Sequence, residues 1–172
     1  MELAEKDRPA RTGAASFVQS EVFARTFREG MSLVEDTANY LDGEGRDAAK
    51  SLTRSAALSY AGASMRLTTQ LMQIASWLLV LRALREGDMP LKDAGDDKYR
   101  LNGRERITPD MLSGDLPKKL MTLIDDAGQL YDRIYRLDSD LFRDIGARPV
   151  TQDAAAQQRA LLDAFGGAGR QP

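Results

Sequence analysis

The stretch LTTQLMQIASWLLVL, residues 67–81, decides the fold of this chain of 172 residues. It carries no charge, and its apolar residues recur every three or four positions, which is the spacing of one face of a helix. The stretch is shorter than the roughly 18–20 apolar residues that cross a bilayer, and Thr68, Gln70 and Ser76 interrupt it. We therefore predict a buried core helix rather than a membrane span.

Two further long helices are predicted on either side of this one. The middle helix extends over residues 47–86 without a proline, and Ser20 is the predicted N-cap of a first helix that ends at Gly43. Asp115 is the predicted cap of a third helix, which ends by Gly146. The core stripe of the first helix is predicted at Phe23, Phe27, Val34, Ala38 and Leu41, and that of the third at Leu120, Leu123, Ala127, Leu130, Ile134, Leu137 and Leu141.

The predicted fold class is all-α, an antiparallel three-helix bundle with an up-down-up order. Residues 88–114 lose the helical period and form a long loop before the third helix. The predicted organisation is a disordered N-terminal segment at residues 1–15, the bundle at residues 16–146 and a flexible C-terminal tail at residues 147–172.

The amino-acid composition excludes most familiar kinds of catalytic and metal-binding site. The chain has no Cys and no His, which removes thiol nucleophiles, Ser-His-Asp triads and nearly all zinc and haem sites. A formal net charge of -2 provides no bulk attraction to nucleic acid, and the N-terminus lacks the apolar segment of a secretory signal. We expect a cytoplasmic, non-enzymatic protein without catalytic residues, cofactor, metal or nucleic-acid partner and without membrane insertion.

The polar face of the middle helix is unusual because it carries no charge between Arg66 and Arg82. Solvated helix faces normally collect Lys and Glu, whereas interface cores lose charge and retain aromatic residues and Arg. This face is therefore predicted as a partner or dimer interface. The alternative is that it covers the edge of the bundle as ordinary surface. The predicted interface residues are Arg66, Thr69, Gln70, Gln73, Trp77 and Val80.

The apolar arc of the same helix is wider than a bundle requires. The apolar residues cover about 200° around the helix axis, whereas a single core stripe needs an arc only slightly wider than ~100°. The excess includes Met65, Met72 and Leu79. Because this surface needs a cover, a homodimer is expected, but the sequence does not say which surface forms it.

The tail contains one apolar cluster, at Leu161, Leu162 and Phe165. This cluster is a candidate docking motif that folds into a short amphipathic segment on a partner. The alternative is an inert end of the chain.

Several blocks of the sequence resemble the alphaproteobacterial family called regulator of CtrA degradation. They are FREGM at residues 27–31, YLDG at residues 40–43, Gly45-Arg46 and, above all, SMRLTTQLMQIASWLL at residues 64–79. The resemblance covers residues 20–84 most clearly. It implies a cytoplasmic three-helix bundle, often dimeric, without catalytic activity of its own.

The resemblance also implies a function, as an adaptor for the ClpXP protease in cell-cycle-regulated proteolysis. Members of the family join protease that a response-regulator-type partner has primed, and they tether substrates or a further adaptor to it, in part at the cell pole. The alternative is a regulatory or scaffold bundle that modulates another protein, for example a transcription regulator, without protease. A small-molecule sensor is a third possibility, to be tested by ligand-dependent melting.

Overall fold

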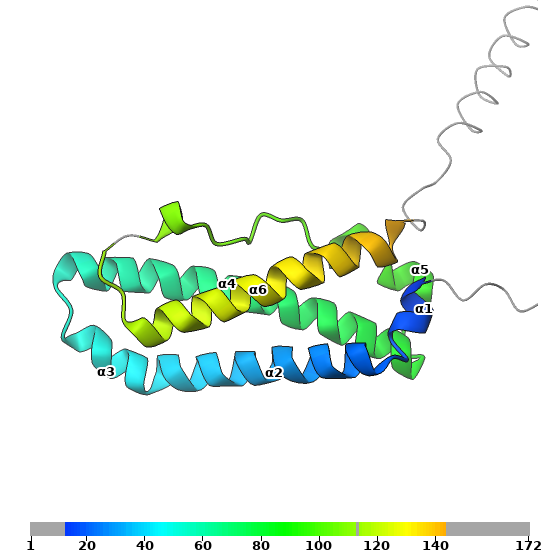
Figure 1. Cartoon of the computed structure of the whole chain (residues 1–172), viewed down its shortest axis with the longest axis horizontal. Coiled ribbons are helices and arrows are strands. Elements are labelled where there is room, and N and C mark those ends of the chain that lie inside the picture. Colours follow the sequence, from blue (N-terminus) through cyan, green and yellow to red (C-terminus); the bar gives the residue numbers. More distant parts are fainter. Residues whose placement is uncertain (1–12, 113, 144–172) are drawn as a thin grey trace, which may run out of the picture. The chain divides into compact units, whose positions relative to one another are not determined.

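The computed structural model describes residues 13–112 and 114–143, in which three main helices pack together (Figure 1). The main helices are α2 (Glu21–Asp42), α4 (Arg54–Glu86) and α6 (Lys118–Leu141). Shorter elements are α1 (Gly13–Phe17), α3 (Glu44–Lys50), α5 (Leu91–Ala94) and the 3-10 helices η1 (Asp97–Tyr99) and η2 (Pro109–Met111). The chain divides into two units, Met1–Phe142 and Arg143–Pro172, and all these elements lie in the first. The predicted all-α fold with three packed helices is confirmed.

Local sequence signals place most helix ends. The Ser20 hydroxyl oxygen accepts a hydrogen bond from the Phe23 backbone N–H at 3.2 Å, which confirms the predicted cap of α2. The middle helix begins at Arg54 rather than at Asp47, because Thr53 caps it through the Ala56 N–H at 3.2 Å. The preceding residues form the separate helix α3.

The beginning of the third helix and the first residues of the bundle also differ from the prediction. Helix α6 begins after Pro117 without a side-chain cap, so Asp115 does not have the predicted role. Helix α1 begins within the segment predicted to be disordered, and its Ala14 is fully buried. Residues 1–12 of that segment lie outside the described residues.

The direction of the third helix corrects the predicted up-down-up order. Trp77 of α4 contacts Asp138 of α6, while Gly114, just before α6, lies beside Ser59 near the start of α4. These two contacts show that α6 runs parallel to α4. Helix α2 is antiparallel to both, because Gly30 lies against Leu78 near the end of α4, whereas Tyr40 lies near Tyr60 at its beginning. The segment between η1 and α6 returns along the length of the bundle (Figure 1). This long return lets α4 and α6 run in the same direction, whereas a short connection would make neighbouring helices antiparallel.

The side of α2 that faces the core is rotated from the predicted stripe. Its buried residues are Phe23, Thr26, Gly30, Thr37 and Tyr40, whereas Val34 and Leu41 are only half-buried and Ala38 is exposed. A Cβ atom at Gly30 would overlap the side chain of Leu78. The absence of a side chain at Gly30 thus lets α2 and α4 approach closely, and Val34 and Leu41 lie beside the buried face of α2.

Gly45 is a second site of close approach, and it yields a prediction about stability. A Cβ atom there would lie 2.6 Å from the Tyr60 hydroxyl oxygen and 2.7 Å from Cε1 of Tyr40. Gly45→Ala is therefore expected to lower the free energy of unfolding by about 1–3 kcal/mol through overpacking, measured by chemical denaturation.

Gly128, within α6, provides the matched control for this substitution. A Cβ atom at Gly128 meets nothing within 4 Å. Gly128→Ala is expected to raise the free energy of unfolding by roughly 0.5–1 kcal/mol, because Ala restricts the unfolded chain and suits a helix. Equal effects of the two substitutions would contradict the close packing at Gly45.

Candidate functional site

The structure separates the six residues predicted as an interface. Trp77 is 2% exposed and Gln70 is fully buried, so both point into the bundle. For these two residues the prediction of a partner-facing position is wrong, because Trp77 contacts Asp138 of α6 and Gln70 is enclosed within the bundle. Arg66 and Thr69 are exposed, while Gln73 and Val80 are half-buried. For these four residues partner contact stays a prediction.

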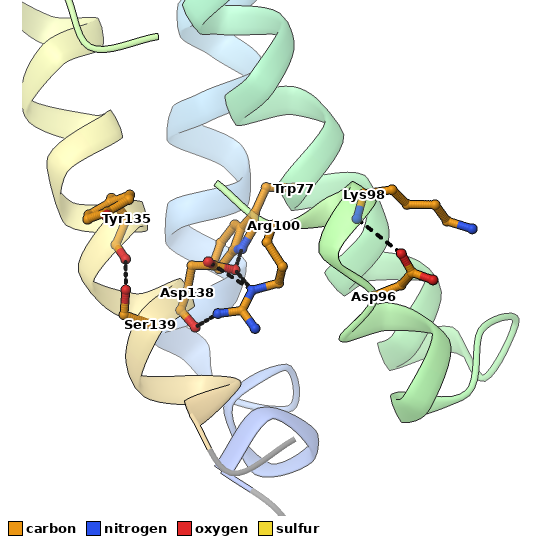
Figure 2. Close-up of polar contacts among 7 residues, drawn as sticks. All are labelled: Trp77, Asp96, Lys98, Arg100, Tyr135, Asp138 and Ser139. Carbon is orange, nitrogen blue, oxygen red and sulfur yellow. Dashed lines mark hydrogen bonds and ion pairs between the residues drawn. The ribbon is translucent and has the colours of Figure 1, made fainter. Parts of the chain in front are cut away.

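Trp77 belongs to a polar cluster that joins three parts of the chain (Figure 2). Its indole Nε1–H donates to Asp138 Oδ1 at 2.9 Å. The Arg100 guanidinium donates through Nε to both carboxylate oxygens of Asp138 and through Nη2 to the Asp138 backbone oxygen, each at 2.9 Å. The same guanidinium carbon lies 4.7 Å from the centre of the Phe142 ring.

This cluster holds parts of the fold together and does not resemble a reactive site. We call the contacts of Asp138 with Trp77 and Arg100 the structural lock. Asp138 is 2% exposed, and its carboxylate is fully engaged by one ion pair and one indole donor. A buried carboxylate is tolerated when it is paired and hydrogen-bonded in this way. The contacts fix the connection after η1 to α4 and α6, and so they hold the returning segment in place.

The sequence did not predict a buried Asp138, because its apolar neighbours Leu137 and Leu141 were assigned to the core stripe of the third helix. A signal was nevertheless present. Asp138 lies seven residues after Tyr131 and four before Phe142, on a second apolar stripe of the third helix. Tyr131 and Phe142 are both buried in the structure, so the position between them faces the core as well.

A row of large apolar side chains lies uncovered on another face of α4. We call it the α4 apolar row, and it consists of Leu58, Met65, Met72 and Leu79. Their exposed fractions are 76%, 72%, 65% and 51%, respectively. The excess apolar arc predicted from the sequence is therefore located on this face. Exposed apolar patches of this kind typically mark interaction surfaces.

A pocket of about 170 Å³ opens beside this row, between α2 and α4. One of its walls is formed by three residues that were assigned to the α2 core stripe, the half-buried Val34 and Leu41 and the exposed Ala38. Its lining is almost entirely apolar, which suits a hydrophobic side chain better than a polar ligand. The lining residues include Val34, Ala38 and Leu41 from α2 and Thr68, Met72 and Ala75 from α4.

Among the residues that the structure describes, the titratable groups form no arrangement suited to catalysis or metal binding. No group of three or more acidic side chains that could hold a metal ion occurs in the part of the chain that the structure describes. Burial raises the pKa of Tyr131 and of Tyr40, so both phenols stay neutral near pH 7 and cannot act as bases there. Within residues 13–112 and 114–143, nothing indicates catalysis.

Two other predictions concern the long apolar helix and the tail. Helix α4 has the length and hydropathy of a membrane-spanning helix, but Leu67, Ile74 and Leu78 are fully buried in the bundle. It is therefore the core helix of the bundle. The predicted flexible tail lies outside the described residues, including its docking candidates Leu161, Leu162 and Phe165.

Comparison with known proteins places the chain in a family. A family model described as "Protein of unknown function (DUF1465)" matches residues 14–165. The crystal structure of RcdA from Caulobacter crescentus CB15 is similar, with 49% sequence identity and a TM-score of 0.63 over 74% of this chain and 97% of that chain. No curated protein matches the sequence. The resemblance inferred from the sequence blocks is confirmed, and the chain belongs to the DUF1465 family.

Proposed function

We propose that this protein is a cytoplasmic, non-enzymatic adaptor that tethers substrates or further adaptors to the ClpXP protease. The observation that carries the proposal is the 49% identity to RcdA over 97% of that chain. The sequence blocks at residues 27–31 and 64–79 resemble the family called regulator of CtrA degradation, whose members act in cell-cycle-regulated proteolysis. We therefore infer the same role for this chain.

Two physical features support an adaptor role. The α4 apolar row offers a surface for protein contacts, since large uncovered apolar side chains gain free energy when a partner excludes water from them. An adaptor that holds both protease and substrate raises their effective concentration, so the individual contacts need not be strong. The proposed partners are ClpXP with a response-regulator-type priming protein, and substrate proteins or a further adaptor, with assembly at the cell pole.

The test is a degradation assay with purified components. Candidate cell-cycle regulators are incubated with ClpXP and its priming partner, with and without the full-length chain. The adaptor role predicts faster loss of substrate only when both this protein and the priming partner are present. A substrate that ClpX recognises directly serves as the control for protease activity.

A deletion of residues 149–172 and the triple variant Leu161→Ser/Leu162→Ser/Phe165→Ser then locate the activity. Acceleration that both changes abolish would assign docking to the apolar cluster of the tail. Acceleration that survives both would assign it to the bundle. No acceleration of any candidate, with an active protease, would contradict the adaptor role and favour the scaffold function.

A further inference from the structure

The pocket between α2 and α4 is elongated along both helices. Its lining extends from Val34 to Leu41 on α2 and from Thr68 to Ala75 on α4. On each helix the outermost lining residues are two turns apart, which is a length of about 10 Å. A helix that docks in a groove presents apolar side chains at the same spacing of three, four and seven residues. The shape of the pocket therefore suits a helix that lies along it.

The pocket has room for one large side chain. Its volume is about 170 Å³, and an apolar cavity of about 150 Å³ in another protein holds a benzene molecule. The exposed Met72 of the α4 apolar row forms part of its wall, whereas Leu71 and Thr37 of the lining are buried. An aromatic side chain that enters beside Met72 can thus contact the buried residues of the lining.

One polar atom of the lining indicates which aromatic side chain fits. Thr37 is 2% exposed, and its hydroxyl oxygen has no hydrogen-bond partner in the described part of the chain. Most buried polar side-chain atoms in proteins are paired, so this hydroxyl is suited to a polar group that an occupant brings. Tyrosine combines an apolar ring with a hydroxyl, which usually finds a partner when it is buried. A tyrosine side chain therefore fits the pocket better than phenylalanine.

The edge of the pocket on α2 is acidic. Glu35 and Asp42 are exposed, and they lie three residues before and four residues after Ala38, so they flank it on the same helix face. Neither carboxylate forms an ion pair with another of the described residues. Residues 29–42 contain no Lys or Arg that could offset the charge. This edge therefore favours a positively charged occupant.

The end of α2 adds to the negative charge of this edge. Asp42 is the last residue of the helix, and the last turn contains no basic residue. The backbone dipole makes the C-terminus of a helix partly negative, so cations are favoured there and carboxylates are not. A second copy of this chain, with a formal net charge of -2, brings no excess of positive charge. Charge complementarity thus favours a basic segment of a different protein.

We propose that the pocket binds a basic amphipathic helix of another protein. A tyrosine of that helix enters the pocket beside Met72, and its Lys or Arg residues lie next to Glu35 and Asp42. The inference deepens the adaptor role, because it names the class of segment that the adaptor holds, and it rests on that role in taking the occupant from another protein. The binding tests use no protease, so they can fail while the degradation assay succeeds, and the reverse.

The probe is a fluorescein-labelled synthetic peptide of about five helical turns, with a leucine stripe, one central tyrosine and flanking lysines. Fluorescence anisotropy measures its binding to the full-length chain. Two reference peptides carry glutamates in place of the lysines or the same residues in scrambled order. The lysine peptide is expected to bind at least about tenfold more tightly than either reference. Equal binding of the three peptides, or binding of none, would overturn the proposal.

Charge reversal tests the acidic edge. The double variant Glu35→Lys/Asp42→Lys is expected to prefer the glutamate peptide over the lysine peptide. The control is Asp125→Lys/Asp126→Lys, which makes the same change in net charge at two exposed aspartates of α6. This control should retain the preference for the lysine peptide. If both double variants change their preference alike, net charge and not the edge of the pocket selects the peptide, and the proposal is wrong.

A cycle of two substitutions tests the tyrosine anchor. Exchanging the tyrosine of the peptide for phenylalanine is expected to weaken binding to the wild-type chain about fivefold, through the loss of one hydrogen bond. With Thr37→Val the two peptides should bind equally, because the partner hydroxyl is gone. A tyrosine peptide without any advantage over the phenylalanine peptide would overturn the anchor, and an advantage that persists in Thr37→Val would do so as well.

Met72→Gln tests the position of the site without changing the charge. It replaces an apolar side chain of the lining by a polar one and is expected to weaken binding of the lysine peptide about tenfold. Met121→Gln is the control, because Met121 lies on α6, is 41% exposed and does not line the pocket. Thermal melting followed by circular dichroism checks that both variants remain folded. Equal affinities of the two variants would contradict the site.

Sedimentation velocity of the same samples tests for a second copy as the occupant. The proposal predicts that Met72→Gln leaves the oligomeric state of the chain unchanged. A dimer that Met72→Gln dissociates, in a chain that does not bind the lysine peptide, would assign the pocket to a second copy and overturn the proposal.

Discussion

Replacing Trp77 by Ala is expected to lower the free energy of unfolding by about 3–5 kcal/mol. Trp77 is 2% exposed and lies among the largest fully buried side chains of the bundle. Its removal leaves a cavity between α4 and α6, and it also leaves Asp138 without its indole donor. Urea denaturation of the full chain, followed by circular dichroism, measures this effect.

Trp77→Phe is the control that divides the effect into packing and hydrogen bonding. It keeps most of the apolar volume but loses the Nε1–H donor, so it is expected to cost less than Trp77→Ala. If Trp77→Ala leaves the free energy of unfolding unchanged and only weakens partner binding, Trp77 is a surface residue and is not buried between α4 and α6.

Asp138→Ala is expected to lower the free energy of unfolding by about 3 kcal/mol, at the lower end of the range for breaking a buried ion pair. The substitution leaves both the Arg100 guanidinium and the Trp77 indole N–H without their carboxylate acceptor. The Arg100 side chain is 21% exposed, and this partial contact with water limits the cost. The same denaturation experiment measures the change.

Asp132→Ala supplies the matched control, because Asp132 also lies on α6 and also forms an ion pair with the connection that precedes this helix. Asp132 pairs with Arg106 at 2.7 Å, but its side chain is 48% exposed. Exposed pairs of this kind contribute about 0–1 kcal/mol. Equal losses for Asp138→Ala and Asp132→Ala would contradict the structural lock, whereas a large difference would support it.

The lock also has a local consequence for the returning segment. Arg100 follows η1, and its bonds to Asp138 tie the start of the connection to α6. Without these bonds the segment loses its main polar attachment near Trp77. Hydrogen exchange in the segment is therefore expected to rise in Asp138→Ala by more than in Asp132→Ala.

Local signals in the sequence determined where helices form. Ser20 caps α2 through a neighbouring backbone N–H, and Gly87 ends α4 with a φ of 82°, a backbone conformation that suits glycine. The core residues Leu67, Ile74 and Leu78 were likewise evident, because a charge-free run with helical spacing has to be buried. These features depend only on residues a few positions apart in the chain.

Tertiary packing decided which edge of each apolar arc faces the core. On α2 the close approach of Leu78 turns Gly30 toward the core and leaves Val34 and Leu41 in the wall of the pocket. On α4 the packing buries Trp77 and Gln70, which were predicted to face a partner, and it leaves Met65 and Met72 of the excess apolar arc exposed. Periodicity gives the width of an apolar arc, but not the contact that another helix makes with it.

The sequence by itself thus determined the all-α class, the three main helices and the excess of apolar surface on the middle one. Only the tertiary structure decided that α6 runs parallel to α4 and that Asp138 meets Trp77 and Arg100. The physical reason is separation along the chain. The long connection is compatible with either direction of the third helix, and the side chains that select one direction meet only after the helices have packed.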